Sequence, residues 1–306
     1  MNNVQTIIDQ YLDFCQYQKR LNTKTLKAYR IDLKQFSSQL TILSFSAVTS
    51  DILESYISTL HKTYQPKTVK RKIASIKALF HYLEYKNIIQ INPFNKILLK
   101  FREPIRLPKI IPLHTIETFL SVMYTQKQTV STPLQKKCII RDIAVIELLF
   151  ATGIRISELC SLKPSNINLY EQNILIYGKG SKERRLQIGN DDTIRALKEY
   201  QSTYQQEIQD CGYFFVNRLH HRLSEQSVRE MINKYTSLAA INLHITPHMF
   251  RHSFATYLLE ADVDIRYIQE MLGHSSISVT QIYTHVAMAK QKDILTTKHP
   301  RKNFKL

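Results

Sequence analysis

PHMFRHSFATYLLEADVDIRYIQEMLGHSSISVTQIY, residues 247–283, is the stretch that decides which fold and which chemistry we expect of this chain. It places His248, Arg251, His274 and Tyr283 in one short run near the C-terminus, with a glycine-ended helix between its two halves. Cationic groups, an imidazole and a phenol are what an attack on a phosphodiester needs when no metal ion takes part. The stretch therefore predicts a site that breaks DNA strands.

The first half of this stretch predicts a helix with two unlike faces. Thr246 is a favourable N-cap, and Pro247 is favourable as the first helical residue. The polar face carries His248, Arg251 and His252 at i, i+3 and i+4, and the opposite face carries Phe250, Phe254, Tyr257 and Leu258. Surface histidines and an ion-paired arginine would also explain this polar face, but the pattern HxxRH on an otherwise apolar helix indicates a functional site.

The second half predicts another helix, residues 264–272, which ends at Gly273 in the left-handed conformation. His274 follows directly, so the glycine cap would hold its imidazole in place. The simpler interpretation of His274 is an interaction with the helix dipole. Tyr283 is one of 17 tyrosines in the chain, so its neighbours and not the composition single it out.

A second candidate region, ATGIRISELCSL, covers residues 151–162. Arg155 and Glu158 are i, i+3 neighbours among apolar residues, and a guanidinium in such surroundings needs an anionic partner. That partner is either Glu158 itself or a phosphate that Arg155 binds while Glu158 orients the site.

The segment NILIYGKGSKERRLQI, residues 173–188, predicts a β-hairpin with a glycine-rich basic turn. The turn does not match a phosphate-binding P-loop, because Asn173 and Gly180 break the required pattern. Lys179 in this turn is either a solvated lysine or a mobile cation that can reach a leaving oxygen.

The N-terminal part, residues 1–100, predicts helices from its apolar spacing. After Pro66 one helix bears a basic face, which is either a solvated surface or a set of DNA phosphate contacts, and we favour DNA binding because the charges cluster. Those basic residues are Lys67, Lys70, Arg71 and Lys77.

Three prolines in KFREPIRLPKIIP, residues 100–112, predict an extended linker. We therefore expect a helical DNA-binding domain at residues 1–100, a linker at 101–112 and a second domain at 113–306. The second domain combines helices with the predicted hairpin. The fold class is thus mainly α-helical with a small β-hairpin or sheet in the second domain (α+β).

The composition indicates which kind of binding partner to expect. The 306-residue chain has a formal net charge of +17, of which residues 1–105 carry +9 and residues 106–306 carry +8. Such a charge favours a polyanion, and we expect nucleic acid. The sequence shows no signal peptide and no apolar run long enough to span a membrane, so we expect a cytoplasmic protein. Four widely spaced cysteines give no zinc pattern and are expected to be free thiols.

The order of four motifs resembles the tyrosine recombinase (phage integrase) family, above all its Xer-type and short integrases. These motifs are ATGIRISEL, GKGSKERR, ITPHMFRHSFATYLLE and IQEMLGHSSISVTQIYTHV. The N-terminal segments NTKTLKAYRIDLKQF and PKTVKRKIASIKALFHYLEYKNIIQINP resemble the core-binding (SAM-like) domain of that family, and KHPRK resembles its C-terminal tail. The resemblance covers nearly the whole chain.

This resemblance implies a site-specific recombinase that exchanges DNA strands by two transesterifications without metal or cofactor. Tyr283 would be the nucleophile and form a 3′-phosphotyrosyl link. Arg155 and Arg251 would bind the non-bridging phosphate oxygens, and Lys179 would help to protonate the departing 5′-oxygen. His248 and His274 match the two remaining site positions, Glu158 matches a supporting acid, and His252 receives no primary role.

The resemblance also implies an assembly. The two domains would form a C-shaped clamp on double-stranded DNA, and four copies would join two duplexes through their C-terminal tails and a Holliday junction. A type IB topoisomerase and a DNA-binding regulator without cleavage are the alternatives. The sequence leaves open integration or excision of a mobile element against Xer-type dimer resolution, the DNA target, and the need for a second recombinase or helper protein.

Overall fold

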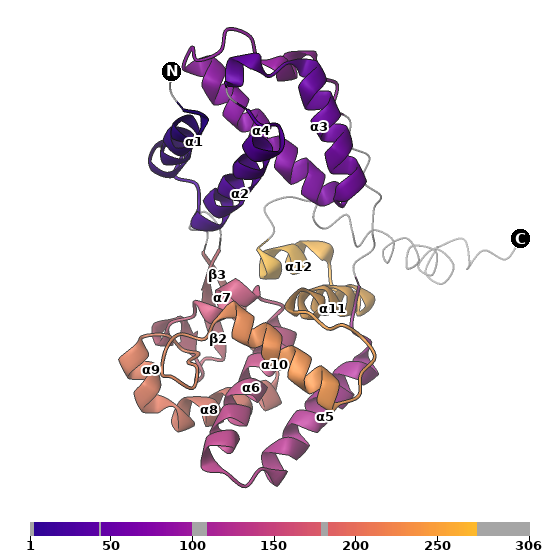
Figure 1. The fold of residues 1–306 in the computed structure, drawn as a ribbon. Coiled ribbons are helices and arrows are strands. Elements are labelled where there is room, and N and C mark those ends of the chain that lie inside the picture. The colour runs from indigo at the N-terminus through magenta and orange to yellow at the C-terminus, as the bar shows by residue number, and fades with distance from the viewer. Residues whose placement is uncertain (1–2, 43, 100–108, 179–182, 274–306) are drawn as a thin grey trace, which may run out of the picture. The chain divides into compact units, whose positions relative to one another are not determined.

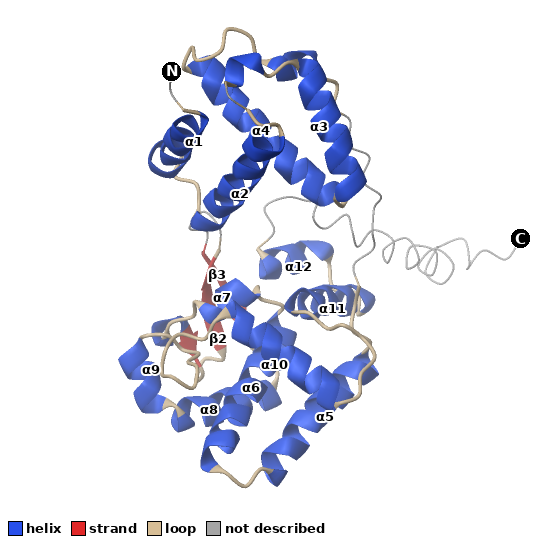
Figure 2. Cartoon of the chain, viewed as in Figure 1, coloured by secondary structure: helices blue, strands red, loops and turns tan. Residues whose placement is uncertain are grey.

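The computed structural model describes residues 3–42, 44–99, 109–178 and 183–273. The chain divides into two compact units, Met1–Ile105 and Arg106–Leu306. Helices dominate both, and a small antiparallel sheet lies in the second, which confirms the predicted fold class (Figure 2). Lys179, His274, Tyr283 and the C-terminal tail lie outside the described residues.

In its described residues the first unit packs four α-helices together (Figure 1), and the core between them is rich in aromatic side chains. Phe36 and Phe80 meet edge to face with their ring centroids 6.1 Å apart, in the geometry that aromatic pairs prefer. The α-helices are α1 (Val4–Asp13), α2 (Thr23–Gln39), α3 (Ser50–Thr63) and α4 (Pro66–Tyr85), and the shorter turns are η1 (Phe14–Gln18), η2 (Phe45–Ala47) and η3 (Pro93–Lys96).

Local sequence sets where these helices begin. The Asn22 side chain accepts a hydrogen bond from the backbone N–H of Thr25 at 2.8 Å and so caps α2. Proline is the first residue of α4, where its missing N–H costs no hydrogen bond. The apolar positions expected along α4 are all buried, and they are Val69, Ile73, Ile76, Phe80 and Leu83.

The second unit is built around one long helix, α6 (Pro133–Thr152). Its residues 143–149 are buried on every side, which is the pattern of a helix at the centre of a domain. Helices α5, α7, α8 and α11 contact it. The α-helices are α5 (Leu113–Thr129), α7 (Ile156–Cys160), α8 (Asp191–Thr203), α9 (Gln205–Cys211), α10 (Glu225–Leu238), α11 (Pro247–Glu260) and α12 (Ile265–Leu272), and η4 (Pro164–Asn166) is a short turn.

Gly153 ends α6 for two separate reasons. Its φ of +59° lies in the left-handed region that favours glycine. A Cβ atom at this position would lie 2.6 Å from Cδ1 of Phe254 on α11, so α11 packs against the backbone here. The chain can therefore turn sharply and present Arg155 two residues later.

The sheet is an antiparallel meander of β1 (Ile167–Asn168), β2 (Asn173–Tyr177) and β3 (Glu183–Gln187). The β2–β3 pair confirms the predicted hairpin, whereas the sequence did not indicate β1. Tyr177 pairs with Glu183 and Ile176 with Arg184, so the described ladder reaches the residues that flank the turn.

Candidate active site

Arg155 and Glu158 sit together at the start of α7. Arg155 is the N-cap residue, and its backbone N–H donates to Oε2 of Glu158 at 2.8 Å while its Nη1 donates to Oε1 at 2.7 Å. Glu158 thus supplies the acidic half of a capping box, and an ion pair takes the place of the other half, because a guanidinium cannot accept a hydrogen bond. Glu158 is therefore a partner of Arg155, as the simpler interpretation held, yet 34% of the Arg155 side chain stays exposed and accessible to a phosphate.

A second arginine, Arg184 on β3, binds the same carboxylate. Its Nη2 donates to Oε2 of Glu158 at 2.7 Å and its Nη1 donates to Oε1 at 3.1 Å. Burial alone would raise the pKa of Glu158, but the hydrogen bonds and charges of Arg184 and Arg155 lower it below its usual value. Glu158 thus stays ionised and holds two guanidinium groups in fixed positions.

Arg251 lies on α11, on the face that also carries His248 and His252, and its side chain is buried. Its Nη1 donates to the Gly153 carbonyl at 2.8 Å, and its Nη2 donates to the Leu272 carbonyl at 2.6 Å. Both carbonyls belong to the last turns of helices, which leave acceptors without partners inside the helix. The guanidinium is buried because these two helix ends supply the acceptors that it needs.

The three arginines meet at the C-terminal end of α12. Arg184 donates through Nε to the Met271 carbonyl at 2.8 Å, Arg251 binds the next carbonyl, and Arg155 Nη2 lies 3.5 Å from the carbonyl of Gly273. A helix C-terminus carries partial negative charge, which stabilises cations there. Gly273 has a φ of +62°, which confirms the glycine cap predicted before His274.

His248 is exposed on the first turn of α11, and His252 lies one turn further and is half-buried. Desolvation lowers the pKa of His248, and the charges of Arg251, Arg229 and Arg155 lower it further. Desolvation is also the main cause of the lowered pKa of His252. Both imidazoles are therefore mostly neutral near pH 7. Thr246 occupies the N-cap position as expected, although its side chain accepts no capping hydrogen bond within the described residues.

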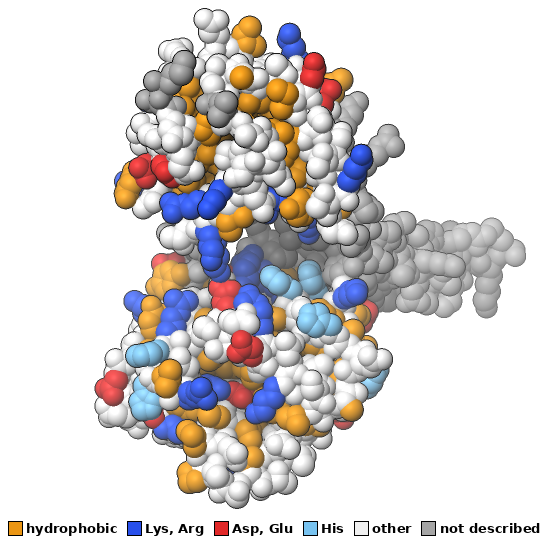
Figure 3. Space-filling view, in the orientation of Figure 1, with side chains coloured by type: hydrophobic (Ala, Val, Ile, Leu, Met, Phe, Trp, Pro, Cys, Tyr) orange, Lys and Arg blue, Asp and Glu red, His pale blue; other side chains and the backbone are white. Residues whose placement is uncertain are grey.

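Lys179, His274 and Tyr283 lie outside the described residues, so only part of the predicted site can be placed. The structure brings together Arg155, Glu158 and Arg251, which come from two separate motifs. In Figure 3, Lys, Arg and His side chains gather over α7, α11 and α12.

Sequence reasoning missed Arg184, although a signal for it exists. Residues alternate between the faces of a strand, and in β3 Arg184 shares its face with buried Leu186, whereas Arg185 is exposed. A charged residue on the inward face of a strand needs a partner.

The four basic residues expected to contact DNA are all exposed on α4. Arg71 also forms an ion pair with the buried carboxylate of Asp32, so it has a structural partner within the unit. The residues in question are Lys67, Lys70, Arg71 and Lys77.

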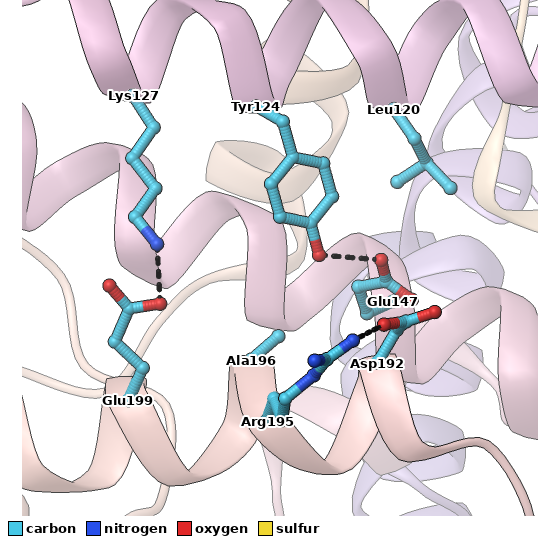
Figure 4. A pocket seen from close by; sticks show the side chains of 8 residues that line it. All are labelled: Leu120, Tyr124, Lys127, Glu147, Asp192, Arg195, Ala196 and Glu199. Atoms are coloured by element: carbon cyan, nitrogen blue, oxygen red, sulfur yellow. Dashed lines mark hydrogen bonds and ion pairs between the residues drawn. The ribbon is translucent and has the colours of Figure 1, made fainter.

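A separate pocket of about 480 Å³ lies between α5, α6 and α8 (Figure 4). Its charged residues pair with one another: Lys127 with Glu199, and Arg195 with Asp192. Glu147 accepts a hydrogen bond from the Tyr124 hydroxyl at 2.9 Å. None of the residues that line this pocket is among Arg155, Glu158, Arg184 and Arg251.

No group of three or more His, Cys, Asp or Glu residues in the described part of the chain is placed to hold a metal ion. Among the same residues, no helix combines the length and the apolar character that crossing a membrane requires.

Three arginines, Arg155, Arg184 and Arg251, thus lie at one helix end of the second unit, and the first unit carries exposed basic residues on α4. A comparison with known protein families identifies the class of protein. Residues 118–290 match the phage integrase family, and residues 8–87 match the phage integrase N-terminal SAM-like domain.

Curated relatives agree over nearly the full length. A tyrosine recombinase of Agathobacter rectalis is 62% identical over 304 residues, with 99% of each chain covered. Tyrosine recombinase XerD of Listeria monocytogenes is 34% identical, and the match covers 96% of this chain and 99% of the relative. The chain therefore belongs to the phage integrase family. It is a tyrosine-type site-specific recombinase, an enzyme that breaks and rejoins DNA.

Solved structures share the fold at lower identity. The XerH site-specific recombinase bound to palindromic difH substrate has a TM-score of 0.72 at 22% identity, covering 95% of this chain and 84% of that one. A lambda integrase tetramer bound to a Holliday junction has a TM-score of 0.69 at 15% identity, covering 90% of this chain and 78% of that one.

Proposed function

We propose that Tyr283 is the nucleophile that attacks the scissile phosphate, with Arg155 and Arg251 binding its non-bridging oxygens. Lys179 protonates the departing 5′-oxygen, which generates a 5′-hydroxyl. His248 and His274 complete the site, and Glu158 supports it by holding Arg155.

The chemistry balances in two steps. In the first, the Tyr283 oxygen forms a bond to phosphorus while the bond from phosphorus to the 5′-oxygen breaks, which leaves a 3′-phosphotyrosyl link. In the second, a 5′-hydroxyl of the partner strand attacks this phosphorus and releases the tyrosine. Each step exchanges one phosphoester for another, so no external energy source is required.

One observation carries the assignment. The guanidinium groups of Arg155 and Arg251 reach adjacent carbonyls at the end of α12, although they come from different elements. The chain segment that bears His274 and Tyr283 begins at this helix end. Fixed donors of this kind stabilise the charge that grows on the phosphate oxygens in the transition state.

The first unit supplies DNA affinity in this proposal. Residues 1–100 form the DNA-binding domain, residues 101–112 the linker, and residues 113–306 the catalytic domain with its tail. Exposed lysines on α4 contact backbone phosphates, which gives affinity without reading the sequence. The residues proposed for this contact are Lys67, Lys70, Arg71 and Lys77.

We propose that four copies act on two duplexes through a Holliday junction, linked by their C-terminal tails. The lambda integrase solved as a tetramer on a Holliday junction supports this assembly, as does the XerH complex with its difH substrate. The four free cysteines fit a reducing cytoplasm, where we place the protein. The biological role is mobile-element integration or excision, or Xer-type resolution, with or without a helper protein.

The test of the nucleophile is covalent trapping. The full chain is incubated with nicked suicide duplexes made from DNA that flanks its gene, and the products are separated on a denaturing gel. Tyr283→Phe is compared with Tyr267→Phe, a matched control because Tyr267 is an exposed tyrosine of the same region. We expect a covalent band with the wild type and the control, and none with Tyr283→Phe.

Two results would change the assignment. A band that persists in Tyr283→Phe would move the nucleophile to another residue. Relaxation of supercoiled DNA without a specific site would instead favour the topoisomerase alternative.

A further inference from the structure

Arg184 connects three elements of the catalytic unit. It begins on β3, its guanidinium makes a two-pronged ion pair with Glu158 on α7, and its Nε donates to the Met271 carbonyl of α12. Its side chain is only 10% exposed, and that of Glu158 is 6% exposed. A side chain so enclosed, with its donors bound on both sides, holds its strand in one position.

That strand leads directly from the turn that carries Lys179. Arg184 pairs with Ile176, and the next pair, Tyr177 with Glu183, is the last one among the described residues. Lys179 follows Tyr177 by only two residues in the sequence. Fixing Arg184 therefore fixes the base from which the turn lysine extends.

The same side chain also contacts the start of the nucleophile segment. A Cβ atom on Gly273 would lie 2.9 Å from Nη1 of Arg184 and 3.2 Å from its Cδ. Arg184 is thus packed against the glycine cap of α12, and the chain continues from Gly273 to His274.

An arginine is required for this arrangement. A guanidinium can bind a carboxylate with two parallel hydrogen bonds and still donate a third from Nε, whereas a lysine ammonium acts as a point charge. Arg155 makes two hydrogen bonds of its own to Glu158, separate from those of Arg184, so we expect Arg155 to stay in place when Arg184 is changed. The base of the hairpin is therefore the part that depends on Arg184.

We propose that Arg184 is a positioning residue for strand cleavage, which sets the base of the β2–β3 turn so that Lys179 reaches the leaving oxygen. This proposal rests on the proposed role of Lys179 as the proton donor. Arg184 itself does not touch the DNA.

The test uses the full chain and two suicide duplexes that differ in one atom. One has an ordinary scissile phosphate, and the other has sulfur in place of the bridging 5′-oxygen. A thiolate leaves without a proton, so the sulfur duplex does not need the proton donor. Single-turnover cleavage rates and DNA affinity are measured for Arg184→Lys, Arg184→Gln and Lys179→Ala, with Arg185→Lys and Arg185→Gln as controls from the exposed face of the same strand.

We expect Arg184→Lys and Arg184→Gln to cleave the ordinary duplex about 10²-fold more slowly, because a small misplacement of a catalytic group has this effect. On the sulfur duplex most of that defect disappears, as it does for Lys179→Ala, because loss of a general acid costs roughly 10²–10⁴-fold only where a proton is needed. DNA affinity is unchanged. The Arg185 variants stay within about twofold of the wild type on both duplexes.

An equal defect of the Arg184 variants on both duplexes would overturn the proposal, and so would weaker DNA binding without slower cleavage. A defect rescued in Arg184→Lys but not in Arg184→Gln on the ordinary duplex would show that charge alone suffices and would also overturn it. Failure of the proposed function is visible separately: in that case Lys179→Ala cleaves the ordinary duplex as fast as the wild type.

Discussion

Each unit of this protein contains one buried carboxylate held by two basic residues, and the two sites differ in what balances the charge. In the first unit, Asp32 is fully buried and binds Arg71 and Lys72, and the hydroxyl of Ser75 donates to it at 3.3 Å. In the second, Glu158 binds Arg155 and Arg184. A third guanidinium, that of Arg251, binds the Leu272 carbonyl at the end of α12.

In both clusters the basic residues outnumber the carboxylate. The clusters differ in which groups contact this excess positive charge. Lys72 is buried beside Asp32, where its ammonium also contacts Gln35 and lies 4.9 Å from the centre of the Tyr64 ring. The guanidinium groups around Glu158 bind main-chain carbonyls of α6 and α12 instead. Carbonyl dipoles fix the geometry of a cation without neutralising its charge.

The two clusters also differ in what their charges can do. The Asp32 cluster uses its charges to join α2 to α4 inside one unit. The Glu158 cluster has three guanidinium groups for one carboxylate, and its surplus charge remains for a phosphate. A cluster in which guanidinium groups outnumber carboxylates, and in which main-chain carbonyls bind the guanidinium groups as well, is therefore a candidate anion site.

The largest effect we expect is on stability, from Asp32→Asn. Removing one partner of a buried ion pair leaves Lys72 without its counter-charge and costs about 3–5 kcal/mol of the free energy of unfolding. Hydrogen exchange of peptides from α2 and α4 in the full chain measures this loss. Glu54→Gln, which changes an exposed carboxylate of α3, should stay within about 0.5 kcal/mol of the wild type. Equal protection in the two variants would show that the Asp32 cluster is not structural.

The second-largest effect we expect is a lower rate of DNA cleavage in Arg251→Lys. A lysine cannot reach the Gly153 and Leu272 carbonyls while also binding the phosphate, so we expect the cleavage rate to fall by roughly 10²–10³, as for other fixed donors. Single-turnover cleavage of a suicide duplex measures it, and thermal melting shows whether the variant is folded. An unchanged rate in a folded variant would show that Arg251 has a structural role and does not bind the phosphate.

The smallest effect we expect is a dependence of the stability on pH, which comes from His248. The folded-state pKa of His248 lies below the ordinary value of 6.5, so the folded protein binds this proton less readily than the unfolded chain does. The stability that neutral His248 contributes is complete above pH 6.5 and is lost as the pH falls through that value towards the folded-state pKa. Melting temperatures of the wild type should therefore fall between about pH 7.5 and pH 5.5 by more than those of His248→Gln. His252→Gln should act in the same direction, and parallel curves for all three proteins would contradict the shift.

Much of the fold followed from local patterns. The helices of the first unit matched their apolar spacing, and the hairpin appeared where an alternating segment flanked a glycine-rich turn. Gly273 ends α12 at positive φ, as its place in the sequence suggested. The strand β1 gave no signal, because two residues are too short to show alternation.

Much less of the site could be predicted by residue. The sequence identified Arg155, Glu158 and Arg251, and it left open whether Glu158 was a partner of Arg155, which the structure shows that it is. It placed Arg251 on the polar face of its helix, but it gave no sign that two helix ends come together there and bury the guanidinium. It did not identify Arg184, whose partners lie on α7 and α12.

The sequence by itself determined the class of protein and the chemical groups available to it, because motif order, charge and helix caps are local properties that a chain carries before it folds. Only the tertiary structure decided what each guanidinium binds. The acceptors of Arg155, Arg184 and Arg251 include carbonyls at the end of α12, and a backbone carbonyl is present at every residue. No side-chain pattern marks such an acceptor, so its role appears only when a helix end is packed against the arginines.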